Sequence, residues 1–133
     1  MNTFARRLTA GSRARLGWRL LLLLLIAAVS YLALTPRPPI DLTTGWDKFD
    51  HVTAFSALAL AGCLGFPESR RQWLLVMCAL LGFGALIEVL QYFVPGRSCE
   101  WGDLIADSVG MGVGSLMASC GLAVARVDSP SAR

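Results

Sequence analysis

Apolar residues fall into four long blocks along the chain, and short polar segments separate them. A helix needs about 20 apolar residues to cross the ~30 Å hydrocarbon core of a bilayer, and each block has roughly this length. Buried helices of a soluble bundle would carry polar stripes at helical spacing, which the first and third blocks mostly lack. We therefore predict four transmembrane helices, at residues 18–35, about 49–66, 73–94 and 104–127.

The connections between the blocks are short and contain proline. A proline-rich segment at residues 36–46 predicts an extended outer linker, and we expect turns near Pro67 and Pro95. Short connections make neighbouring helices antiparallel, so the predicted fold class is all-α, a polytopic four-helix antiparallel bundle. Small residues at every fourth position favour close helix packing or an oligomer; they are Ala57, Ala61, Gly65, Ala106, Gly110 and Gly114.

Composition and charge predict that this bundle lies in a membrane and in which orientation. Of 133 residues, 55% are hydrophobic and only 16% are charged, which excludes a disordered chain and argues against an ordinary soluble enzyme. The net charge of +3 divides into +7 on the side of the two termini and −4 on the other side. Because basic loops stay in the cytoplasm, we predict an inner-membrane protein with a cytoplasmic N-terminus (1–17) and tail (128–133). The basic N-terminus abuts a hydrophobic span, so we expect no nucleic-acid partner.

The first block also has the features of a secretory signal peptide. It begins with arginines, continues with leucines and contains Ala28-Val29-Ser30, a small-residue cleavage site. The apolar run continues past this site to Leu34, which is long enough to anchor the segment in the membrane. We therefore expect the first helix to be retained, with cleavage as the alternative.

Ionisable residues gather at the same predicted end of three helices. His51 lies at the start of the second block, Glu88 near the end of the third and Asp107 at the start of the fourth. Such groups are costly inside a membrane and mark functional sites. Several have a polar neighbour at i+3 or i+4, on the same helix face. The candidate site consists of His51, Glu88, Asp103 and Asp107 as catalytic residues, with Asp47, Lys48, Gln91 and Arg97 as binding residues.

Three uses of this site stay open. An enzyme acting on a lipid head group would use His51 as base or nucleophile, with Asp47 or Asp103 to orient it, and Glu88 as acid. Lys48 and Arg97 would hold phosphate. A non-catalytic module would bind or transport an envelope lipid or an antibiotic with the same residues. A purely structural network would bond His51, Glu88 and Asp107 to one another.

We predict neither a cofactor nor a metal. His51, Asp47, Glu88 and Asp103 have the chemistry of metal ligands. The chain has a single histidine, however, and no local ligand motif such as H-E-x-x-H. The expected partners are membrane lipids, including lipid-linked envelope precursors.

Four short motifs occur in order across residues 46–117. They are Asp47-Lys48-x-x-His51-x-x-x-Phe55, Glu88-x-x-Gln91, Pro95-Gly96-Arg97-Ser98 and Asp103-x-x-x-Asp107-x-x-Gly110. In these motifs the segment resembles the VanZ-like membrane proteins, so residues 46–127 form a predicted VanZ-like domain. Many members have Asn in place of Asp107 and Asp in place of Glu100. The resemblance implies a small multi-span protein of the bacterial envelope, in a family whose founding member is associated with resistance to the glycopeptide teicoplanin.

Overall fold

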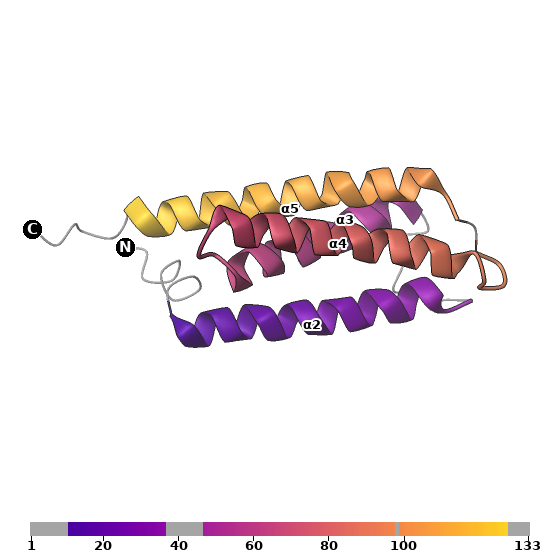
Figure 1. The fold of residues 1–133 in the computed structure, drawn as a ribbon, viewed down its shortest axis with the longest axis horizontal. Coiled ribbons are helices and arrows are strands. Elements are labelled where there is room, and N and C mark those ends of the chain that lie inside the picture. The colour runs from indigo at the N-terminus through magenta and orange to yellow at the C-terminus, as the bar shows by residue number, and fades with distance from the viewer. Residues whose placement is uncertain (1–10, 37–46, 98, 128–133) are drawn as a thin grey trace, which may run out of the picture.

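The computed structural model describes residues 11–36, 47–97 and 99–127. These form four helices: α2 (Ser12–Leu34), α3 (Asp47–Gly65), α4 (Arg70–Gln91) and α5 (Trp101–Val127). The helices run along the long axis of the molecule in alternating directions, so the start of α2 and the end of α5 lie at one end (Figure 1). The all-α prediction is confirmed for these residues, among which there is no strand. The predictions for residues 1–10, the linker 37–46, Ser98 and the tail 128–133 lie outside them.

Several helices begin or end a few residues away from the predicted spans, because the apolar block does not mark where the helix itself begins or ends. α2 begins at Ser12, before the predicted start, because its arginines are good helix formers. α4 ends at Gln91 rather than at residue 94, since the chain turns there ahead of Pro95. α5 begins at Trp101 instead of residue 104, so Asp103 belongs to its first turn.

Three of these helices, α2, α4 and α5, are long and apolar enough to cross a membrane. Their outward faces carry large exposed apolar side chains, among them Leu24, Leu74 and Leu116. α3 is not one of the three. It has 19 residues, and its first turn contains charged residues, including Asp47 and Asp50. Length and composition therefore support three of the four predicted spans.

α3 forms the centre of the bundle and is in contact with all three other helices. Phe55 on α3 is almost completely buried. On the facing side of α5, a Cβ atom added at Gly110 would meet the carbonyl oxygen of Val52, and one at Gly114 would meet that of Ser56. The two backbones approach closely because α5 has no side chain at these positions. The small residues of α5 therefore pack against α3 of the same chain.

At the end of the bundle opposite the candidate site, polar groups close two helix termini. Arg19 of α2 donates from Nε to the carbonyl of Gly65, at the end of α3, at 2.9 Å. Its guanidinium carbon lies 4.5 Å from the centre of the Phe66 ring. The Ser69 hydroxyl accepts a bond from the backbone N–H of Gln72 and caps α4. The predicted turn around residue 67 is confirmed.

Candidate functional site

His51 lies where α3, α4 and α5 meet, between two carboxylates. Its Nδ1 is 2.7 Å from Oδ1 of Asp107 on α5, and its Nε2 is 3.9 Å from Oε1 of Glu88 on α4. The three side chains are 11%, 1% and 7% exposed, respectively. An ionised carboxylate only accepts hydrogen bonds, so Nδ1–H donates to Asp107. In the neutral ring, Nε2 therefore carries the free lone pair and faces Glu88.

Glu88 is held by one of its oxygens only. Oε2 accepts the backbone N–H of Glu100 at 3.0 Å, from the segment just before α5. Oε1 is buried and has no hydrogen-bond partner in the described part of the chain. Oδ2 of Asp107 is likewise buried and has no hydrogen-bond partner among the described residues. A Cβ atom added at Gly84 of α4 would lie 2.5 Å from this oxygen. Gly84 thus provides the space that the Asp107 carboxylate occupies.

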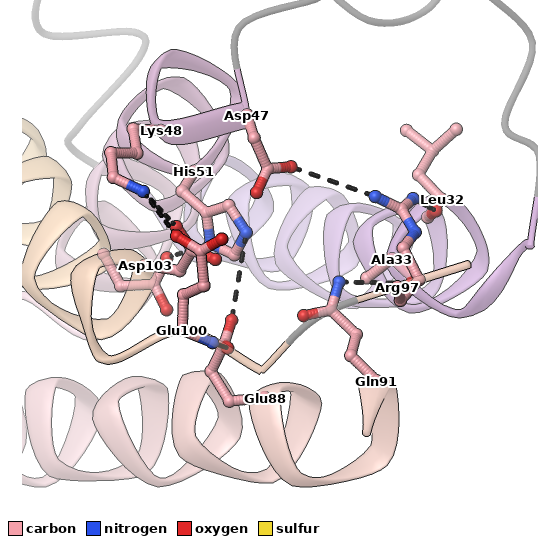
Figure 2. Close-up of polar contacts among 11 residues, drawn as sticks. Leu32, Ala33, Asp47, Lys48, His51, Glu88, Gln91, Arg97, Glu100 and Asp103 are labelled. Carbon is pink, nitrogen blue, oxygen red and sulfur yellow. Dashed lines mark hydrogen bonds and ion pairs between the residues drawn. The ribbon is translucent and has the colours of Figure 1, made fainter. Parts of the chain in front are cut away.

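Lys48 connects the start of α3 with the start of α5. Its Nζ is 2.9 Å from Oε2 of Glu100 and 3.4 Å from Oδ1 of Asp103 (Figure 2). Asp103 is almost fully buried, whereas Lys48 and Glu100 are half exposed. One ammonium group therefore pairs with two carboxylates.

Arg97 and Gln91 close the end of α2. The last carbonyls of a helix lack partners within it, and positive groups at this end are favourable. Arg97 donates to the carbonyl of Leu32 at 2.8 Å, and the Gln91 amide donates to that of Ala33 at 3.2 Å. The same Arg97 guanidinium lies 3.8 Å from Oδ1 of Asp47 (Figure 2). Arg97 therefore points inward toward α2, and its side chain is 20% exposed.

A cavity of about 410 Å³ opens beside His51, between α2, α3 and α4. Apolar side chains form most of its wall, and polar groups gather at one end. The apolar wall includes Val29, Leu32, Phe49, Phe55 and Ile87, and the polar end includes Asp47, Asp50, His51, Gln91 and Arg97. Ligand pockets in proteins commonly have such a composition, with a few polar groups in a largely apolar wall.

Comparison with known families agrees with the motif resemblance. The family model described as VanZ/LLP1 matches residues 19–123, most of the chain. The chain belongs to the VanZ/LLP1 family. The match extends from α2 to near the end of α5 and includes every candidate site residue. No curated protein and no solved structure matches the chain significantly.

Within the VanZ/LLP1 segment, the predicted site residues come together from four parts of the chain. Asp47, Lys48 and His51 are on α3, Glu88 and Gln91 on α4, Arg97 in the following turn, and Asp103 and Asp107 on α5. Sequence reasoning missed Glu100, which holds both Glu88 and Lys48. It also missed the carbonyls at the end of α2, because a backbone oxygen has no signature in a sequence.

The VanZ/LLP1 site also contains a group of possible metal-ligand atoms that lie near one another. Asp47, His51 and Asp103 each offer one such atom, and the three atoms lie within 4.8 Å of one another. These residues come from α3 and α5, the two most closely packed helices, so the backbone places them firmly.

Proposed function

We propose that this protein crosses the bacterial inner membrane four times, with both termini in the cytoplasm. Support comes from the three apolar helices, the alternating directions and the enclosed position of α3. The charge asymmetry of +7 and −4 gives the orientation, since basic segments remain inside. In this arrangement the His51 site and its cavity lie in the outer leaflet.

Cysteine labelling tests this topology. Cys99 is exposed in the segment before α5, at the site end of the bundle. With the other three cysteines replaced by serine, a membrane-impermeant maleimide should label Cys99 in intact spheroplasts. A Glu68→Cys variant of a cysteine-free protein should react only after permeabilisation, because Glu68 lies in the turn at the opposite end. The reverse pattern would refute the orientation.

We further propose that the site binds or modifies the phosphate-bearing head group of a phospholipid or a lipid-linked envelope precursor. The observation that carries this proposal is the cavity, which joins an apolar wall to a polar end containing His51 and Arg97. An apolar chain would fit the wall, and an anionic group would be held at the polar end by the Arg97 guanidinium. The Arg97 guanidinium donates to the Leu32 carbonyl through one nitrogen and pairs only loosely with Asp47, at 3.8 Å, so further N–H donors of the same group remain for a phosphate.

The catalytic form of this proposal uses the His51 arrangement. Asp107 orients the ring, so Nε2 would accept a proton from an attacking hydroxyl or water, or act as the nucleophile. Glu88, 3.9 Å from Nε2, would donate a proton to the leaving group when it is protonated. Asp103 would stabilise positive charge on the ring, and Lys48 would help to hold phosphate.

A binding or transport module without chemistry is the second candidate. The mostly apolar cavity wall favours it, because such walls are typical of sites that hold a ligand intact. An envelope lipid or a glycopeptide antibiotic would be the ligand. An antibiotic ligand would connect the protein to the glycopeptide resistance with which the family's founding member is associated.

Purified protein in lipid nanodiscs separates these functions. Phosphatidylglycerol and a lipid-linked precursor would be supplied, bound lipid measured by native mass spectrometry, and products by liquid chromatography with mass spectrometry. An enzyme should yield product that disappears in His51→Ala and Glu88→Gln. A binding module should retain unaltered lipid, with at least tenfold weaker binding in Arg97→Ala.

The matched control is Arg70→Ala, an exposed arginine at the opposite end of the bundle, which should change neither result. Both forms of the proposal fail if wild-type protein neither binds nor converts lipid while His51→Ala only lowers thermal stability. That outcome would leave a structural polar network as the function of these residues.

A further inference from the structure

The site contains more buried negative charge than its positive groups neutralise. Glu88, Asp103 and Asp107 are each more than nine-tenths buried. Lys48 reaches Asp103 at 3.4 Å but divides its charge with Glu100. His51 faces both other carboxylates and carries at most one charge. Buried carboxylates without adequate partners are strongly destabilising, so the arrangement favours an additional cation.

The ligand atoms for such a cation already lie close together. Asp47, His51 and Asp103 present ligand atoms within 4.8 Å of one another. Two ligands bound to one metal ion at about 2.1 Å stand about 3 to 4 Å apart. Asp47 is exposed and only loosely paired with Arg97, so its side chain can rotate to close the remaining gap.

Glu88 supplies an independent indication of a ligand. Its Oε2 is fixed by the backbone N–H of Glu100, which leaves Oε1 directed at Nε2 of His51 (Figure 2). At 3.9 Å the two atoms are too far apart for a hydrogen bond, and Oε1 has no other such partner among the described residues. A buried carboxylate oxygen and an imidazole lone pair that face each other at this distance would both be satisfied by one metal ion between them.

The surroundings of His51 match those of a metal-binding histidine. Such residues almost always donate their other ring N–H to a carboxylate or a carbonyl, which fixes the ring and raises its basicity. Asp107 provides this contact at 2.7 Å from Nδ1. Nε2 is therefore the nitrogen left for the metal, on the side where Glu88 lies.

We propose that Asp47, His51 and Asp103, together with Oε1 of Glu88, bind one divalent transition-metal ion. One imidazole with several carboxylates suits Mn²⁺, Fe²⁺ or Zn²⁺ better than Mg²⁺, which favours oxygen ligands and retains its water. This revises the expectation of no metal, which rested on the single histidine and on the absence of a local motif. The other ligands here are carboxylates, and the set comes from three helices. With a metal ion bound at Nε2, His51 could not act as a base, and the positive charge of the ion would attract a phosphate group.

The test is metal binding by the whole protein, purified in detergent, stripped with EDTA and titrated with Co²⁺. We expect visible ligand-field absorption that saturates at one Co²⁺ per chain and is displaced by Zn²⁺. Asp47→Asn, at an exposed position, and His51→Ala should each weaken binding at least tenfold. Asp107→Asn should weaken it about 10- to 100-fold while the stoichiometry stays at one. Glu68→Gln, which changes an exposed carboxylate at the other end, should bind as wild type.

Absence of saturable binding in the wild type, or equal affinity in the wild type, Asp47→Asn and His51→Ala, would overturn the metal site. Asp47→Asn keeps the test decisive if His51→Ala does not fold. The result is separable from the proposed function. Head-group binding measured in EDTA tests the lipid proposal even if the metal proposal is wrong. Co²⁺ binding measured without lipid tests the metal proposal even if the lipid proposal is wrong.

Discussion

Replacing Gly114 with alanine tests the contact that places the site helices. The added methyl would meet the carbonyl oxygen of Ser56, and it would lie 3.0 Å from Cβ of Ala59. Overpacking costs about 1–3 kcal/mol. We take the upper value of about 3 kcal/mol, because the obstacle at Ser56 is backbone and cannot rotate away. Alanine regains about 1 kcal/mol of helix propensity, so the net loss in unfolding free energy is about 2 kcal/mol.

Gly112 offers a matched control on the same helix. A Cβ atom there has no neighbour within 4 Å, so Gly112→Ala gains only the propensity of about 1 kcal/mol. At roughly 4 °C per kcal/mol, thermal unfolding in one detergent should show Gly114→Ala about 8 °C below wild type and Gly112→Ala about 4 °C above it. Equal melting temperatures for the two variants would refute the close approach of α3 and α5.

Three further substitutions examine the polar end of the bundle. Asp107→Leu should destabilise the protein by about 1–3 kcal/mol more than Asp107→Asn in thermal unfolding, because the side-chain amide oxygen of the asparagine variant can still accept the N–H of His51. Equal losses of stability in the two variants would contradict this hydrogen bond. Gln91→Leu should loosen the end of α2 by about 1 kcal/mol through loss of its bond to Ala33, seen as faster amide hydrogen exchange there; unchanged exchange would argue against it. Lys48→Met should lower the melting temperature, because it removes the ammonium group 3.4 Å from the almost fully buried Asp103. An unchanged melting temperature would mean that Lys48 does not neutralise Asp103.

Helical spacing and antiparallel topology together were enough to place the site. His51, Glu88 and Asp107 occur at the same predicted end of three helices, and the structure brings them into one cluster. The stripe of Gly110 and Gly114 likewise indicated where a neighbouring helix would approach. These features were predictable because each depends on residue type and on a fixed helical period.

Other features depend on contacts that no residue type specifies. The inward direction of Arg97 follows from carbonyls that α2 leaves unpaired at its end. The hydrogen bond that fixes the Glu88 carboxylate comes from the backbone N–H of Glu100, and any residue except proline could donate it. Hydropathy also does not distinguish an apolar helix that faces lipid from one that faces its neighbours, so the enclosed position of α3 needed the structure.

The placement of α3 has a consequence for how the protein is made. Its short apolar length and charged first turn give it weak affinity for lipid, yet it carries His51 and the residues around it. In the proposed topology α3 leaves the ribosome before α5, the helix against which it packs most extensively. In that topology we expect stable insertion of α3 to depend on α5 as well as on α2, and the polar site is completed only after synthesis of the last helix.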